Sequence, residues 1–161
     1  MNTLIEADES PSIAKFLASR GTTEQIRELL VHRSLYGLKE ADPQVRAIPR
    51  LPHDAKSAFV EVLADEYGGG RPGRLHSELY RQTMDALGLD GTENAHVCGV
   101  PGVTLATVNL MSLFGAHARW RGALVGHFAV TEMTSSEANR CYGRAVRRAG
   151  FTSRCATHYF D

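Results

Sequence analysis

The chain has 161 residues, of which 43% are hydrophobic and 22% are charged, so it has enough apolar material for one domain with a buried core. Its 18 basic residues equal its 18 acidic residues, and this balance provides no net field to attract nucleic acid or an acidic membrane surface. The three cysteines, Cys98, Cys141 and Cys155, form no CxxC pair, which argues against a disulfide framework and a structural zinc site.

The first 52 residues predict a soluble protein that begins with helical structure. The first ten residues, MNTLIEADES, lack the basic and apolar stretches of a signal peptide, so we expect a cytoplasmic protein with a single domain over residues 1–161. Thr22 or Thr23 can cap a first helix that runs to about residue 41, with Pro43 soon after it. The three prolines between residues 42 and 52 predict an extended crossing loop.

The rest of the chain also predicts helices. Asp54 stands at the start of one that the glycines at 68–70 end, and Gly88 closes another over residues 73–87. After a connection over residues 89–101, helices are predicted over residues 103–118, 119–133 and 136–150, and a last one is expected to begin near Ser153. The break before residue 136 rests on Ser135 or Ser136 as a cap. Because no segment alternates as a strand does, the expected fold is an all-α helical bundle.

Two of these segments allow an alternative interpretation. Residues 94–118 contain no charged residue, as a membrane span would require, but Pro101 and several polar residues favour a buried core helix. Basic residues gather in the helix predicted over residues 136–150, without the aromatic platform of a nucleic-acid site, so a solvated helix face is the expected explanation. These basic residues are Arg140, Arg144, Arg147 and Arg148.

Four predicted helices each place one ionisable side chain on a core-facing line. In the second, for example, Phe59, Val62 and Leu63 lead directly to Glu66. The four residues found in this way are Glu40, Glu66, His76 and Glu132. A buried carboxylate is costly unless it is paired, protonated or bound to a metal, so each one alone could form a salt bridge or a helix cap. His117 and His127 also fall beside apolar positions, and periodicity does not choose among the histidines.

A shared metal explains the four residues together more simply than four separate ion pairs. Glu40 and Glu66 lie near predicted helix C-termini, where the helix dipole disfavours an anion and a compensating cation is needed. Oxygen and nitrogen ligands without thiolate suit iron or manganese, and helical bundles build such sites from inward-pointing Glu and His. Nearby Tyr36, Tyr67 and Tyr80 are expected to pack in the core, with a hydrogen bond to a ligand as the alternative.

Four short runs of sequence carry a resemblance to a known family. They are LKEADP at 38–43, DEYGGG at 65–70, LHSELY at 75–80 and GHFAVTEMTSS at 126–136. From about Thr23 onward the chain resembles the iron-containing redox enzymes of the haem-oxygenase-like di-iron oxidase superfamily. The resemblance implies a haem-oxygenase-like bundle with two iron ions that activate O₂ for oxidation of a small organic substrate. It also implies that Glu40, Glu66 and His76 are metal ligands and that Glu132 is an additional one.

The sequence departs from the family pattern at its last residues. The family completes its site with a later helix that carries His, then Asp four residues on, then His three further. The run HYFD at 158–161 resembles only the lead-in to that helix, and His158 and Asp161 do not satisfy the pattern. We therefore expect a C-terminally truncated domain with doubtful iron occupancy and impaired oxidase activity.

Other functions and partners stay open at this point. The alternatives are a haem-binding or metal-free member of the same fold, or a non-catalytic truncated domain. The expected partners of the oxidase are O₂ and a small-molecule substrate, with no nucleic acid and no membrane. A second copy or a partner chain is expected to cover the apolar helix at 103–118, which looks too apolar to face water.

Overall fold

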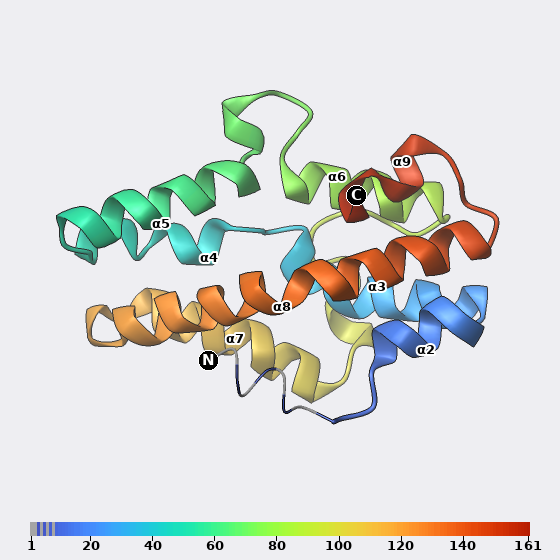
Figure 1. The fold of residues 1–161 in the computed structure, drawn as a ribbon, viewed down its shortest axis with the longest axis horizontal. Helices are drawn as coiled ribbons and strands as arrows, with labels where there is room; N and C mark the ends of the chain where they lie inside the picture. Colours follow the sequence, from blue (N-terminus) through green and yellow to red (C-terminus); the bar gives the residue numbers. More distant parts are fainter. Residues whose placement is uncertain (1–2, 4, 6, 8) are drawn as a thin grey trace.

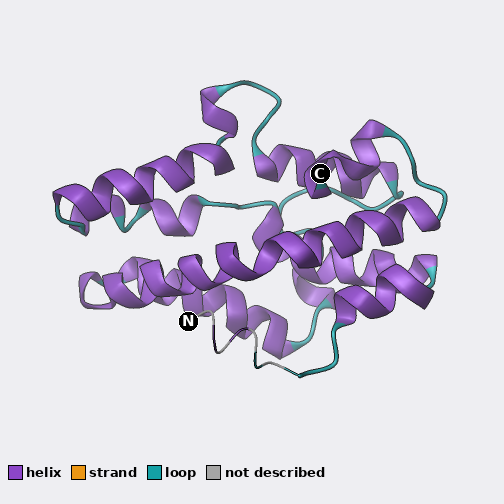
Figure 2. Cartoon of the chain, viewed as in Figure 1, coloured by secondary structure: helices purple, strands orange, loops and turns teal. Residues whose placement is uncertain are grey.

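The computed structural model describes residues 3, 5, 7 and 9–161, and within this part of the chain all regular structure is helical, with no strand (Figure 2). The prediction of an all-α, haem-oxygenase-like fold is confirmed. The α-helices are α2 (Ile13–Arg20), α3 (Thr23–Gly37), α4 (Asp42–Val45), α5 (His53–Glu66), α6 (His76–Ala86), α7 (Gly102–Ala116), α8 (Arg121–Arg148) and α9 (Arg154–Thr157). Short 3-10 helices are η1 (Ile48–Arg50), η2 (Gly68–Gly70), η3 (Val97–Gly99), η4 (Ala118–Trp120) and η5 (His158–Phe160).

Helix α8 runs the length of the molecule, and the other helices gather around its two halves (Figure 1). Around its C-terminal half, α2, α3, α6 and α9 close over one apolar cluster, which includes Leu30, Tyr80 and Val146. Around its N-terminal half, α5 packs through a second cluster in which the Phe59 and Phe128 rings meet edge to face at 5.5 Å. Three of the predicted ligands, Glu40, Glu66 and His76, lie at or just beyond the ends of α3, α5 and α6, which pack into these two clusters.

The two helices predicted over residues 119–133 and 136–150 are one 28-residue helix, so the predicted break is wrong. Hydroxyls at this point bond instead to carbonyls of the preceding turn, and one of them belongs to Ser135, a predicted cap. Thr134 donates to Val130 O at 2.8 Å, and Ser135 donates to Glu132 O at 3.3 Å. Because these side chains bond within the helix, they continue it rather than start a new one. Glu132 is therefore held in the middle of a long helix.

Helix α3 ends four residues before its predicted end. Its start is as expected, because Thr22 forms a capping box with Gln25. At its end, a Cβ on Gly37 would lie 3.0 Å from the ring of Tyr80, so only glycine lets this ring pack so closely. The chain then turns, and Glu40 lies in that turn. The prediction that a helix carries Glu40 is wrong.

The extended loop predicted over residues 42–52 is also wrong, because α4 and η1 lie within it. Pro43 and Pro49 stand in the first turns of these two helices. A proline is favourable there because its fixed φ suits a helix and its missing N–H would have no helical partner. The prolines thus begin short helices rather than prevent them.

Helix α2, capped by Ser12, was not predicted, and it changes the interpretation of the basic cluster. Arg148 on α8 donates to the carbonyls of Leu17 at 2.9 Å and of Gly21, and so satisfies the C-terminal end of α2. Arg148 is therefore a structural contact between two helices. The residue is nevertheless exposed, as the prediction of a solvated face requires.

Helix α7 is not the buried core helix that its composition predicted. It buries Met111 and Gly115 against its neighbours, but Val103 is 74% exposed and Leu113 is 46% exposed. The helix contacts α3, α4 and α8, which cover only part of its surface. Among the described residues, no helix is long and apolar enough to cross a membrane.

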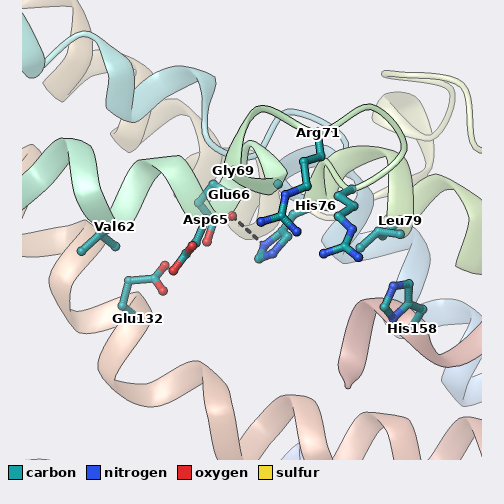
Figure 3. Close-up of a pocket in the computed structure, with 11 residues that line it drawn as sticks. Val62, Asp65, Glu66, Gly69, Arg71, His76, Leu79, Glu132 and His158 are labelled. Atoms are coloured by element: carbon teal, nitrogen blue, oxygen red, sulfur yellow. Dashed lines mark ion pairs between the residues drawn. The ribbon is translucent and has the colours of Figure 1, made fainter.

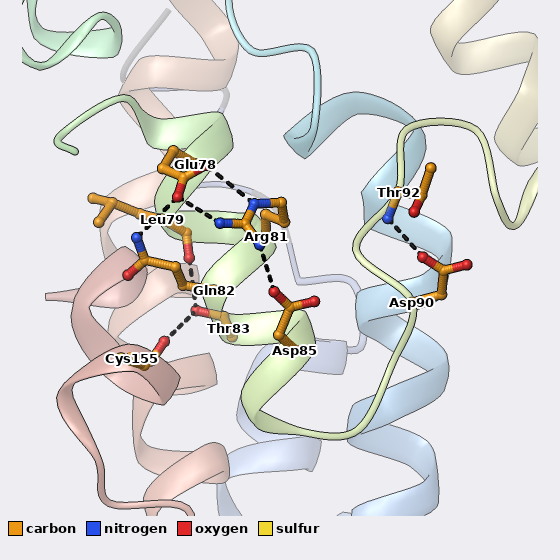
Figure 4. Close-up of polar contacts among 9 residues, drawn as sticks. All are labelled: Glu78, Leu79, Arg81, Gln82, Thr83, Asp85, Asp90, Thr92 and Cys155. Carbon is orange, nitrogen blue, oxygen red and sulfur yellow. Dashed lines mark hydrogen bonds and ion pairs between the residues drawn. The ribbon is translucent and has the colours of Figure 1, made fainter. Parts of the chain in front are cut away.

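Helix α6 separates a charged outer face from an inner face that holds α9 (Figure 4). On the outer face the Arg81 guanidinium binds Glu78 and Asp85, each at 2.6 Å. On the inner face Thr83 Oγ1 lies 3.3 Å from the carbonyl oxygen of Cys155, within hydrogen-bonding distance of α9. This contact helps to place the C-terminal segment beside the start of α6, where His76 lies.

Candidate metal centre

The structure brings together three of the four predicted ligands. Glu40, Glu66 and His76 each offer one ligand atom, and these atoms all lie within 4.8 Å of one another. Glu40 lies in the turn after α3, Glu66 is the last residue of α5, and His76 is the first residue of α6. Three element ends therefore converge on one point, which is the geometry that a shared cation requires.

Glu66 is at the centre of this arrangement and is only 5% exposed. His76 Nδ1 lies 2.9 Å from Glu66 Oε2, as Figure 3 shows. A protonated His76 forms an ion pair with Glu66 across this distance, and no other group in the described residues donates a hydrogen bond to the buried Oε2. A buried carboxylate needs a compensating cation, which is either the protonated imidazole or a metal ion that both residues bind. Two carboxylates and one imidazole, without thiolate, fit iron or manganese.

Glu132 lies at the edge of the cluster rather than within it. It is half-buried on α8, and its side chain extends toward the carboxylates of Asp65 and Glu66 (Figure 3). Burial and the charge of Glu66 raise its pKa. It would join the other three only as an additional ligand at the side of the site.

A pocket of about 570 Å³ opens beside the cluster. Glu66, His76 and Glu132 line it from α5, α6 and α8, while Arg71 and Arg74 line it from the loop between α5 and α6 (Figure 3). The carboxylates therefore face the pocket from one side and exposed guanidinium groups border it on another.

The last residues of the described chain contribute a contact that periodicity did not reveal. Tyr159 in η5 is partly buried and donates a hydrogen bond to Glu40 Oε2 at 2.9 Å. Its ring also meets the ring of His76 edge to face, with 6.2 Å between the centroids. Tyr159 thus orients two of the clustered residues. It lies in a three-residue helix, which is too short for its sequence to show a buried face.

Neighbouring polar residues do not join the cluster. Asp161 forms an ion pair with Arg147, and His158 Nε2 lies 3.4 Å from Arg154 Nη2 at the rim of the pocket. The hydroxyls of the three tyrosines considered from the sequence also bond elsewhere. Tyr80 donates to Leu30 O, Tyr67 donates to Asp42, and Tyr36 accepts from Gln44.

The loop that joins Glu66 to His76 depends on one glycine in particular. Gly68 has a φ of +63°, in the left-handed region, and a Cβ there would lie 2.6 Å from the backbone of Arg74. Gly70 has a similar φ of +72°, but a Cβ there would meet nothing within 4 Å. The close approach at Gly68 folds the loop back on itself and sets how α6 begins beside the end of α5.

Crowded acidic groups perturb the protonation of the metal-free site. Burial and the nearby charge of Glu66 raise the pKa of Glu40 to about 7. The Glu66 carboxylate beside Nδ1 also raises the pKa of His76 above its ordinary value. Both groups hold their protons more tightly in the folded chain than in the unfolded chain. Folding without a metal is therefore linked to proton uptake at this site.

We expect the metal-free chain to lose stability as the pH rises from about 4.5 to about 7, the interval between the ordinary and the raised pKa of Glu40. In this interval the folded state holds more protons than the unfolded state, so the free energy of unfolding decreases with rising pH. Urea unfolding at pH 5.5 and at pH 7.5 measures this change. The Glu40→Gln variant cannot titrate at this position and should show a smaller difference. A wild-type chain that gains stability over the same interval would contradict the expectation.

Comparison with known proteins places the chain in a family. The family described as iron-containing redox enzymes matches residues 27–161. A nitrosourea synthase from Streptomyces achromogenes subsp. streptozoticus is 31% identical over 90 residues, which make up 56% of this chain and 19% of that protein. The match thus covers about a fifth of the relative's length. Because the family match extends over most of the chain and includes all four predicted ligands, the chain belongs to the family of iron-containing redox enzymes.

Proposed function

We propose that Glu40, Glu66 and His76 bind iron, that Glu132 is an additional ligand, and that the site serves the oxidation of a small organic molecule by O₂. The observation that carries this proposal is the convergence of one ligand atom each from Glu40, Glu66 and His76, all within 4.8 Å of one another. An ion pair between Glu66 and a protonated His76 neutralises only one of the two carboxylates, whereas a shared cation would be bound by all three groups. Membership of the iron-containing redox enzyme family supports iron as the metal.

The chain's own residues would prepare the site for its metal. Ferrous iron supplies the ability to bind and reduce O₂, and the protein supplies ligand geometry and a site with little water. Glu40 and Glu66 provide negative charge that balances the cation. Tyr159 holds Glu40 through its hydroxyl, and the burial of Glu66 limits water at the ligand atoms. The open pocket beside Glu132 leaves a route for small molecules.

The proposal for this chain alone is weak binding and little or no oxidase turnover. A di-iron site is the arrangement that the resemblance implies, and Glu40, Glu66, His76 and Glu132 offer only one imidazole and three carboxylates for two ions. Of these, three ligand atoms meet at one point. Such a set suits one ion, and a second ion would need further donors.

Anaerobic titration with Fe(II), followed by exposure to O₂, tests the proposal. We expect about one Fe(II) per chain and slow oxidation of the bound iron. No saturable uptake of Fe(II) would overturn the assignment of the site. Two tightly bound ions with rapid O₂ consumption would instead show that the chain suffices for a di-iron site. Addition of haemin separates the haem-binding alternative, because a Soret band that shifts on binding and blocks Fe(II) uptake would favour haem.

Replacing Tyr159 with phenylalanine is expected to weaken Fe(II) binding by about 10- to 100-fold, as is typical when a hydrogen bond to a metal ligand is lost. The change removes the donor to Glu40 Oε2 and keeps the ring that packs against His76. Tyr80→Phe is the matched control, because it removes a buried hydroxyl that bonds to the backbone at Leu30. Calorimetric titration of both variants measures the effect. Equal losses of affinity in the two would show that Tyr159 acts only through general stability.

A further inference from the structure

A separate pocket of about 370 Å³ lies between α3, α7 and α8. We infer that this pocket binds the organic substrate, and that the substrate is a small, mainly apolar molecule with a carboxylate that pairs with Arg33. That the bound molecule is a substrate rests on the proposed function. The pocket shares no lining residue with the one beside Glu66. The inference combines the apolar wall of the pocket with two polar groups that lack adequate partners.

Most of the accessible surface of the pocket is apolar, although seven of its nine lining residues carry a polar group. Val108 and Met111 line it from α7, and Met111 is only 3% exposed. Pockets that are largely apolar with a few placed polar groups are typical binding sites for small organic molecules. A rigid anionic probe of about a dozen heavy atoms is of the right order for such a volume.

His127 is one of the polar groups without a partner. Its Nδ1 is buried, and no described residue forms a hydrogen bond with it. His32 also lines the pocket, but its Nδ1 lies 3.1 Å from Thr104 Oγ1 and is satisfied. A buried ring nitrogen without a partner at a pocket wall indicates that a bound molecule completes its hydrogen bonding.

Arg33 is the second polar group without an adequate partner, and its positive charge would select a ligand that carries a negative charge. Its guanidinium stacks over the Tyr142 ring at 5.1 Å and makes one long hydrogen bond of 3.4 Å to Asn139 Oδ1. Within the described part of the chain, no carboxylate lies within ion-pair distance of Arg33, although Arg81 and Arg147 each have one. The charge of Glu40 acts on Arg33 from a greater distance, without a contact. The flat fork of this partly buried guanidinium fits a carboxylate at closer range.

Tyr36 connects this pocket to the candidate metal centre. Its ring lines the pocket, and its hydroxyl accepts a hydrogen bond from Gln44 Nε2 at 3.1 Å. Tyr36 lies in the last turn of α3, four residues before Glu40 in the turn that follows. A molecule in the pocket would therefore lie beside the ring that borders the metal site.

Calorimetry with 3-phenylpropanoate and its neutral analogue 3-phenylpropanamide tests the inference, with and without Fe(II). We expect the carboxylate to bind at least tenfold more tightly than the amide. The Arg33→Gln variant should lose this preference and keep its affinity for the amide. Equal binding of the two probes to the wild-type chain, or an unchanged preference in Arg33→Gln, would overturn the inference. Because binding is also measured without metal, a failure of Fe(II) uptake is a separate result.

Three further variants distinguish binding in this pocket from general misfolding and from binding at the other pocket. Thr107 lines the pocket from α7, so Thr107→Phe should fill it and abolish probe binding, while exposed Asn109→Phe on the same helix should not. Arg71 and Arg74 are exposed beside the other pocket, and glutamine at both positions should leave the carboxylate preference intact. Normal binding by Thr107→Phe, or loss of the preference in the Arg71 and Arg74 double variant, would place the anion elsewhere and refute the inference.

Discussion

Replacing Glu66 with alanine is expected to lower the affinity of the chain for Fe(II) by at least about 100-fold, because even a partner of a metal ligand commonly accounts for 10- to 100-fold. Glu66 is the most buried of the clustered residues, and its Oε2 lies 2.9 Å from His76 Nδ1. Its removal would leave only Glu40 and His76 at the point of convergence, with Glu132 at the side, which is too few for a stable site. Anaerobic calorimetric titration with Fe(II) measures the loss, and His76→Ala should behave in the same way.

The matched control is Glu61→Ala. Glu61 lies on the same helix and carries the same side chain, but it is exposed to solvent. Its loss should leave the affinity for Fe(II) within about twofold of the wild-type value, since exposed surface substitutions change free energies by at most about 0.5 kcal/mol. Circular dichroism of each variant shows whether it is folded. Full binding by folded Glu66→Ala would refute the proposed site.

The second large effect is expected from Gly68→Ala, which should destabilise the chain by about 2–5 kcal/mol. The positive φ costs about 1–2 kcal/mol for a residue with a Cβ, and a forced overlap commonly adds about 1–3 kcal/mol. The overlap here is with the backbone of Arg74, at 2.6 Å, and backbone cannot rotate away as a side chain can. Because this loop joins Glu66 to His76, Fe(II) binding should weaken together with stability. Urea unfolding and Fe(II) titration measure the two effects.

The Gly70→Ala variant separates the cost of the positive φ from the cost of the overlap with Arg74. Gly70 also has a positive φ, but a Cβ there would contact nothing within 4 Å. This variant should lose only about 1–2 kcal/mol and should still bind Fe(II). Equal destabilisation by the two substitutions would mean that the contact with Arg74 has no role in holding the loop.

The sequence was sufficient for the helical fold and for most of the residues of the candidate site. Apolar lines on the helices led to Glu66 and His76, and the glycines at 68–70 predicted the end of α5. The same periodicity placed Glu40 on a helix that in fact ends at Gly37. Periodicity shows which face of a helix is buried, but it does not show where the helix ends, and α3 ends at Gly37, which packs against the Tyr80 ring from a distant part of the chain.

Other features depend on contacts that local sequence does not contain. The hydroxyls of Thr134 and Ser135 could have capped a new helix, and only the structure shows that they bond within α8. Tyr159 reaches Glu40 across 119 positions of the chain. The exposure of Val103 follows from how few neighbours α7 has, although its apolar composition predicted full burial. Long-range packing decided each of these outcomes.

The convergence of element ends at the cluster has a consequence for local dynamics. Glu66 ends α5, His76 begins α6, and Glu40 follows α3, so the ligand atoms lie where helices are first to fray. A cation bound to all three would link these ends and oppose their opening. Amide hydrogen exchange at the last turn of α5 and the first turn of α6 should therefore slow on addition of Fe(II), while exchange in the middle of α8 should hardly change.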